Sequence, residues 1–154
     1  MASPQPGLQN DTVDLNLRLL LAVQGGDVDE LRSLVDAGGD PSTLHPTVRL
    51  SALCFACEHD QPQVLVALIE AGADVNWRSE QGWTALHHAV DAEGDLAAQA
   101  GKPLDLRLIQ PLLDAGADAT VTYNGDTALD VARVYGHRLA VEAILDRAGR
   151  KPDG

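Results

Sequence analysis

The segment CFACEHD, residues 54–60, contains residue types that readily do chemistry. Cys54 and Cys57, the only cysteines of the chain, are three residues apart, and His59 follows two residues later. Thiolates and imidazoles bind zinc, and a C-x-x-C pair can cycle between dithiol and disulfide. A structural zinc site needs four ligands, however, and a redox pair normally opens a helix. The segment therefore has three interpretations: half of a metal site, a thiol-redox pair, or core packing.

A second segment, HHAVD at residues 87–91, places His87 and Asp91 one helical turn apart, with His88 beside them. Such a set could hold a metal ion or supply a general base, but either role needs a third anchoring group, and none is evident. The chain also lacks G-x-S-x-G, a phosphate-binding P-loop and H-E-x-x-H. We therefore expect a non-catalytic protein with no cofactor and no bound metal.

The chain repeats itself. LVDAGGD at 34–40 recurs as LIEAGAD at 68–74 and LLDAGAD at 112–118, and SALCFA from 51 recurs as TALHHA from 84 and TALDVA from 127. Aligning both phrases gives four units of about 33 residues, the third with an 11-residue insertion. The predicted units cover about 15–47, 48–80, 81–123 and 124–149. Residues 1–14 and 150–154 are expected to be flexible tails.

Apolar residues recur in each unit at steps of three and four, which place them on one face of a helix. The pattern predicts two short helices per unit, whose apolar faces only the adjacent unit can cover. Cys54 and Cys57 fall on the first helix of unit 2, at positions for small buried side chains, and free cysteine packs as a small hydrophobe. Core packing is therefore favoured over a metal or redox site. Two of the apolar columns are Leu19, Leu53, Leu86 and Leu129, and Leu34, Leu68, Leu112 and Ile144.

The phrases GWTALHHAV, LIQPLLDAGAD and GDTALDVARVYGH resemble the G-x-T-P-L-H-x-A-A and L-L-x-x-G-A-D patterns of the ankyrin repeat family. The resemblance covers roughly residues 15–149, and alanine replaces the motif proline throughout. It implies an all-α helical repeat solenoid of paired antiparallel helices with β-hairpin-like loops. It also implies that His87 forms hydrogen bonds within and between neighbouring loops, and that the protein binds other proteins.

Members of this family usually contact partners through the hairpin tips and the exposed side of the first helices, which form a concave groove. Both tryptophans and both tyrosines of the chain fall at such positions, and these residue types often dominate binding energies. Trp77 and Trp83 could instead cover neighbouring hairpins. The positions carried over from the family are Thr47, Val48, Leu50, Glu58, His59, Trp77, Arg78, Glu80, Gln81, Trp83, Asp91, Ala92, Tyr123, Asn124, Asp126, Val134 and Tyr135.

The net charge of −12 disfavours nucleic acid and anionic membranes as partners and favours a basic protein. No apolar run is long enough to span a bilayer, so we expect a soluble, cytoplasmic protein. We also expect the protein to be monomeric when unbound. A small acidic repeat protein could act as a stoichiometric inhibitor, a role that resembles that of ankyrin-type immunity proteins. The alternative is an adaptor that recruits its partner without inhibiting it.

The insertion at residues 93–105 is expected to lengthen the first helix of unit 3 from Leu96 to Ala100, followed by a turn from Gly101 to Pro103. Insertions in repeat arrays map to loops on one face, often the binding face. A tolerated surface loop is an equally good interpretation.

Overall fold

The computed structural model describes residues 6–101 and 106–149. It consists of helices joined by loops, with one short two-stranded sheet formed by β1 (Thr122–Tyr123) and β2 (Asp126–Thr127). The helices are α1 (Pro6–Gly25), α2 (Val28–Asp36), α3 (Ala52–Glu58), α4 (Pro62–Glu70), α5 (Ala85–Ala100), α6 (Ile109–Asp114), α7 (Ala128–Val134) and α8 (Arg138–Gly149).

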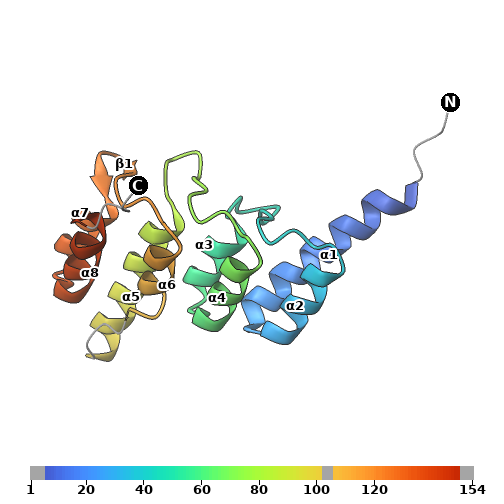
Figure 1. Ribbon diagram of the computed structural model, residues 1–154, viewed down its shortest axis with the longest axis horizontal. Coiled ribbons are helices and arrows are strands. Elements are labelled where there is room, and N and C mark those ends of the chain that lie inside the picture. The colour runs from blue at the N-terminus through green and yellow to red at the C-terminus, as the bar shows by residue number, and fades with distance from the viewer. Residues whose placement is uncertain (1–5, 102–105, 150–154) are drawn as a thin grey trace.

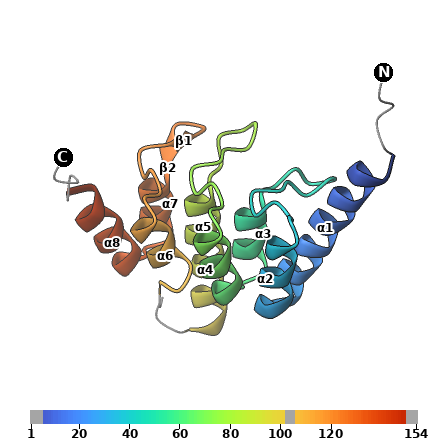
Figure 2. The ribbon, with the colours of Figure 1, turned by 45° about the vertical axis from the view of Figure 1, so that its right-hand side comes forward.

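The helices pack as four consecutive pairs, α1 with α2, α3 with α4, α5 with α6 and α7 with α8. The first helices of successive pairs pack against one another, as do the second helices, so the molecule is a row of hairpins two helices deep. Figures 1 and 2 show this row, with the long loops projecting together from one edge. The predicted all-α repeat fold is confirmed.

The first helices of pairs two to four begin at a hydroxyl residue. The side chains of Ser51, Thr84 and Thr127 accept hydrogen bonds from backbone amides three residues later, which satisfies amides that have no partner within the helix. The second helices of the first three pairs end before a glycine in the left-handed conformation, as at Gly72 with φ 92°. The next amide, that of Ala73, donates to the carbonyl of Leu68 and closes the helix end.

The core runs through the whole row as one continuous cluster of aliphatic side chains. Small residues allow the first helices to approach closely, and Ala56, Ala89 and Ala132 are each fully enclosed. The leucines and isoleucines between the two layers are equally buried, including Leu53, Leu65, Leu68, Leu86, Ile109, Leu112 and Ile144. These are the columns that the sequence pattern predicted.

A ladder of side-chain to backbone hydrogen bonds runs along the base of the loops, where its first rung joins helix α1 to the loop after α2 and the next two join successive loops. The backbone amide of Asp40 donates to Asn16 Oδ1 at 2.9 Å, that of Asp74 to Ser42 Oγ at 3.0 Å, and that of Asp118 to Asn76 Oδ1 at 2.7 Å. Among the described residues the ladder ends at Thr120, whose hydroxyl donates back to the Asp118 carboxylate.

The prediction of a flexible tail over residues 1–14 is corrected by the structure for residues 6–14. Helix α1 already begins at Pro6 and extends beyond the rest of the row (Figure 1). Proline suits the first position of a helix because its missing N–H would have no partner there. The polar run from Gln9 to Thr12 resembles a turn in the sequence, yet it lies within the helix. Residues 1–5 and 150–154 lie outside the described residues.

The insertion lengthens the first helix of the third pair as predicted, because α5 continues through Ala100 and ends at Gly101. The remainder of the expected turn, residues 102–103, lies outside the described residues. After the insertion, the backbone amide of Leu108 donates to the buried carboxylate of Glu93 at 2.6 Å. Glu93 therefore fixes the start of α6 against α5.

The loops are hairpin-like, as the family resemblance implied. Thr122 pairs with Thr127 and Tyr123 with Asp126 in an antiparallel register, and the first long loop closes through a bridge between Leu44 and Ser51. No helix within residues 6–101 and 106–149 is long and apolar enough to span a membrane.

Candidate partner-binding groove

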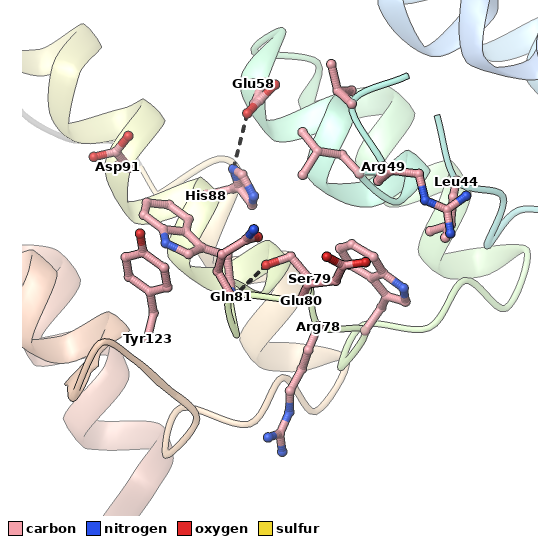
Figure 3. A pocket seen from close by; sticks show the side chains of 14 residues that line it. Leu44, Arg49, Glu58, Arg78, Ser79, Glu80, Gln81, His88, Asp91 and Tyr123 are labelled. Carbon is pink, nitrogen blue, oxygen red and sulfur yellow. Dashed lines mark hydrogen bonds and ion pairs between the residues drawn. The ribbon is translucent and has the colours of Figure 1, made fainter. Parts of the chain in front are cut away.

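A groove of about 640 Å³ lies between the loop that joins α2 to α3 and the loop that joins α4 to α5. Its floor is formed by side chains from α3 and α5, and Tyr123 of β1 closes one end (Figure 3). The lining residues are Leu44, Val48, Arg49, Leu50, Glu58, Trp77, Arg78, Ser79, Glu80, Gln81, Trp83, His88, Asp91 and Tyr123.

Trp83 occupies the centre of an aromatic cluster in this groove. Its ring centroid lies 4.8 Å from that of His88 and 5.1 Å from that of Tyr123, which it meets edge to face. The backbone of Trp83 is fixed as well, because its amide donates to Ser79 Oγ at 3.0 Å and its carbonyl accepts from the Ser79 amide at 2.9 Å. The indole is half-buried and therefore offers a held, partly open aromatic surface.

Two carboxylates, Glu58 of α3 and Asp91 of α5, lie beside this cluster. Burial raises the pKa of Glu58, and the negative charge of Asp91 raises it further while His59 opposes the change. The Oδ1 atom of Asp91 accepts a hydrogen bond from the Tyr135 hydroxyl at 2.7 Å, which raises the pKa of Tyr135 to about 12. The groove is therefore anionic at this end, and Tyr135 orients the Asp91 carboxylate.

His88 lies between these carboxylates, with its Nδ1 atom 3.5 Å from Glu58 Oε1. Burial lowers the pKa of His88 to about 4, although Asp91 acts in the opposite direction. The imidazole is therefore neutral near pH 7, and the contact with Glu58 is that of a neutral ring with a carboxylate. His88 supplies shape and polarity to the groove without cancelling its negative charge.

Most of the predicted site residues are brought together in the groove: Val48, Leu50, Glu58, Trp77, Arg78, Glu80, Gln81, Trp83, Asp91 and Tyr123. The others lie outside its lining. His59 packs against Phe55 with ring centroids 4.4 Å apart, and Tyr135 reaches the groove only through Asp91. Asn124 and Asp126 lie exposed on the β1–β2 hairpin. Exposed Thr47 and Val134 and half-buried Ala92 are also absent from the lining.

The sequence analysis missed Leu44, Arg49, Ser79 and His88 as lining residues. The side chain of His88 is only 11% exposed, yet it borders the groove. Ser79 has a small side chain whose role depends on the turn it forms with Trp83. Arg49 adopts a positive φ of 55°, which no sequence pattern around it indicates.

The residues that first suggested chemistry have structural roles. Cys54 and Cys57 are free thiols with no exposed surface, and burial raises the pKa of Cys54 to about 11 and that of Cys57 as well. A thiol held protonated is a poor nucleophile and a poor metal ligand. Their predicted place in the core is confirmed. Within residues 6–101 and 106–149, no three His, Cys, Asp or Glu side chains are placed to hold a metal ion.

His87 also has a structural role. Its Nδ1 atom lies 2.8 Å from the Thr84 hydroxyl, and the pair forms a capping box at the start of α5. The other ring nitrogen, Nε2, lies 3.4 Å from the backbone carbonyl of Asp126 in the next hairpin loop. Burial lowers the pKa of His87, which keeps the ring neutral. The implied hydrogen bonds within and between loops are confirmed.

Comparisons with known proteins agree with this architecture. Residues 19–99 match a family model described as ankyrin repeats in three copies. Regulatory protein NPR4 of Arabidopsis thaliana is 26% identical over 130 residues, covering 83% of this chain and 20% of NPR4. YahD of Escherichia coli (strain K12), which is named as an ankyrin repeat protein, is 31% identical over 128 residues, covering 82% of this chain and 57% of YahD.

NF-kappa-B inhibitor alpha of Sus scrofa is 33% identical over 88 residues, covering 56% of this chain and 26% of that protein. This chain thus spans only part of the length of each of these relatives. Ankyrin repeats are a protein–protein interaction fold and imply protein partners. The matched family model covers more than half of the chain, including α3 and most of α5 at the floor of the groove, so the chain belongs to the ankyrin repeat family.

Proposed function

We propose that this protein binds a basic protein partner through the groove and acts as its stoichiometric inhibitor. The observation that carries the proposal is the composition of the groove: the aromatic side chains of Trp83 and Tyr123 lie beside the carboxylates of Glu58 and Asp91. Aromatic residues in partly buried pockets often supply most of the binding energy of an interface. The adjacent carboxylates select for a positively charged partner.

The charge of the whole chain supports the same partner. A net charge of −12 attracts a basic protein over a range set by the Debye length, which is about 8 Å at physiological ionic strength. Such attraction raises the association rate more than it raises the final affinity. Binding is therefore expected to slow and weaken as salt is added.

The inhibitory part of the proposal rests on size and on one relative. A compact, acidic repeat array can cover a functional surface of a basic enzyme one-to-one. One matched protein is named as an inhibitor, NF-kappa-B inhibitor alpha. If the partner instead keeps its activity at saturation, this protein is an adaptor.

The test compares a groove variant with a control of equal charge change. The partner is captured from a lysate of the source organism with the wild type, with Asp91→Arg and with Asp36→Arg, and it is then purified. Asp36 is exposed at the end of α2, away from the groove. We expect Asp91→Arg to weaken binding of the purified partner at least about tenfold and Asp36→Arg to change it little. Equal losses in both variants would show that only overall charge matters.

The inhibitor question is answered by titration. The activity of the purified partner is measured as the wild-type protein is added in steps. A linear fall that ends at one equivalent is the result expected for a stoichiometric inhibitor. Full retention of activity at saturation would contradict inhibition and leave the binding function intact.

A further inference from the structure

We infer that the anionic end of the groove is a site for one arginine side chain of the partner, which stacks on Trp83 and donates hydrogen bonds to Glu58 and Asp91. The inference rests on the proposed function, since it names the side chain by which a basic partner would enter the same groove. It goes further because it excludes lysine as an equivalent ligand.

Glu58 and Asp91 face the same space from two helices. They occupy equivalent positions in their repeats, at the end of α3 and within α5, and Figure 3 shows His88 placed between them. The influence of Asp91 on the pKa of Glu58 shows that the two carboxylates lie within electrostatic reach of each other. A ligand at this point therefore meets negative charge from two directions.

Neither Glu58 nor Asp91 forms an ion pair with a lysine or arginine of the part of the chain that the structure describes. Within residues 6–101 and 106–149, the ion pairs of arginine involve other carboxylates, those of Glu30, Asp60, Glu70, Asp114, Asp130 and Glu142. Arg49 and Arg78 line the groove, but their guanidinium groups point away from Glu58 and Asp91 (Figure 3). His88 is neutral near pH 7. The two carboxylates thus line the same groove without a compensating charge from the described residues.

The geometry favours a guanidinium over an ammonium. A guanidinium is planar and carries five N–H donors in a fixed fork, so it can donate to carboxylates on two sides while one face stacks on an aromatic ring. Trp83 offers that ring, and its contacts with Tyr123 and His88 hold the indole in place. An ammonium is a compact, strongly hydrated charge that cannot stack in this way.

The space is also sufficient for a side chain attached to a peptide. The groove volume of about 640 Å³ exceeds that of one side chain, and its remaining length is lined by Leu44, Leu50 and Gln81, which can receive the neighbouring backbone. The Tyr135 hydrogen bond to Asp91 Oδ1 keeps that carboxylate oriented before the ligand arrives. A site fixed in advance loses less side-chain entropy on binding.

The test uses the full chain and three short peptides. The probes are the acetylated and amidated pentapeptide Gly-Ser-Arg-Ser-Gly and its counterparts with lysine or citrulline at the third position. Citrulline keeps the planar group of arginine but has no charge. Binding is followed by the shift of the Trp83 indole N–H signal in nuclear magnetic resonance spectra, with the signal assigned by Trp83→Phe.

We expect the arginine peptide to bind in the millimolar range, as suits a ligand with a single anchoring side chain. The lysine peptide should bind at least about fivefold more weakly, and the citrulline peptide should leave the Trp83 signal unchanged. Glu58→Gln and Asp91→Asn keep the shape of each side chain and should each weaken the arginine peptide about fivefold or more. Asp36→Asn, remote from the groove, should have no effect. Far-ultraviolet circular dichroism checks that every variant is folded.

Equal binding of the arginine and lysine peptides, or no change of the Trp83 signal with arginine peptide at about 10 mM, overturns the inference. Neither outcome removes the proposed function, which is tested separately by the loss of a basic partner in Asp91→Arg. Conversely, an arginine peptide that binds as expected, together with a captured partner unaffected by Asp91→Arg, would support the site and contradict the proposed function.

Discussion

Helices α3 and α5 occupy equivalent places in neighbouring repeats, and both contain side chains that suggest chemistry in the sequence. In α3 the thiols of Cys54 and Cys57 point into the core and have no exposed surface. In α5 Asp91 reaches the groove and His88 borders it. The residue types alone would favour the cysteines as the functional pair. Their positions on the helix instead place the cysteines in the core.

The repeat alignment explains this difference. Cys57 shares its column with Val90, which is equally enclosed, whereas Glu58 shares its column with Asp91, and both line the groove. Cys54 shares its column with His87, and each lies three residues after the hydroxyl residue that caps its helix. In a stacked array, the neighbouring repeat covers a fixed face of each helix, so a side chain has the environment of its column. Reactive residue types in a covered column become packing residues.

The largest expected effect comes from placing a carboxylate in the enclosed column and a thiol in the groove column. Cys57→Asp places a carboxylate in the enclosed column, and an unpaired buried charge of this kind costs about 3–5 kcal/mol in the free energy of unfolding. The reverse exchange, Asp91→Cys, should cost no more than about 1 kcal/mol, since it chiefly removes the hydrogen bond from Tyr135. Urea denaturation measures both. Similar losses for the two variants would show that the columns do not differ in burial.

The next effect is the pH dependence of stability that His88 contributes. Burial lowers its pKa from 6.5 to about 4, so the unfolded chain takes up a proton at a higher pH than the folded protein does. Stability should therefore fall as the pH falls from about 7 to about 4, and His88 should account for about 2–3 kcal/mol of that loss. Glu58, whose pKa is raised, acts in the opposite direction and offsets part of it.

The contribution of His88 is isolated by comparing the wild type with His88→Gln. Thermal or urea unfolding is measured at pH 7, 5.5 and 4 for both proteins. His87 and His137, whose pKa values are also lowered, remain in both proteins, so their contributions cancel in the difference. The variant should lose less stability over this range, and identical pH profiles would contradict a desolvated His88.

The two capping boxes allow a smaller test of the same principle. Thr84 and Thr127 play the same part in α5 and α7, but Thr84 is only 2% exposed, whereas Thr127 is half-buried. Thr84→Ala should lower the free energy of unfolding by about 1–2 kcal/mol and Thr127→Ala by about 0.5–1 kcal/mol. The loss is smaller at Thr127 because water can replace the hydroxyl of this more exposed residue. Chemical denaturation of the two single variants gives the comparison. A larger loss of stability in Thr127→Ala would mean that burial does not determine how much a capping residue stabilises its helix.

The smallest effect on stability, below about 0.5 kcal/mol, is expected for Asp91→Asn, because an amide oxygen can still accept from Tyr135. Its consequence is instead visible in the titration of Tyr135, whose pKa of about 12 depends first on the hydrogen bond to Asp91. Loss of the carboxylate charge should move that pKa toward its usual value of 10. Absorbance at alkaline pH follows the phenol, with Tyr135→Phe identifying its contribution. An unchanged titration would show that the charge of the Asp91 carboxylate does not raise the pKa of Tyr135 in solution.

The fold could be predicted because the same sequence signals recur from unit to unit of the chain. The same apolar columns, hydroxyl caps and terminal glycines occur in several units, so one ambiguous unit is corrected by the others. The error at α1 lies where no repeat supports the interpretation: residues 6–14 precede the first aligned column, and their polar run suggested a tail. Local composition was the only guide there, and Gly7, Asn10 and Thr12 are weak helix formers, yet the helix continues through them.

The candidate groove could be predicted in part because binding positions follow the same columns. Glu58, Trp83 and Asp91 were found in this way. The contributions of Arg49, Ser79 and Tyr135 depend on how loops of adjacent repeats fold over one another, which the columns do not specify. The hydrogen bond of Tyr135 to Asp91 joins residues 44 positions apart and spans the insertion. Such contacts become visible only when the repeats are stacked.

The ladder that joins Asn16 to Asp40, Ser42 to Asp74 and Asn76 to Asp118 has a mechanical consequence. The first rung ties the loop after α2 to helix α1, and the other two fix the distance between the bases of adjacent loops, so that edge of the array resists extension. At the opposite edge the short turns are joined by partly exposed side chains, through the Gln61 hydrogen bond to the Gln24 carbonyl and the ion pair of Arg107 with Asp60, which yield more readily to small sliding movements. Bending of the array should therefore pivot about the loop edge, which would hold the width of the groove nearly constant while the outer helices spread. Slow hydrogen exchange at the amides of Asp40, Asp74 and Asp118 would be the signature of this stiff edge.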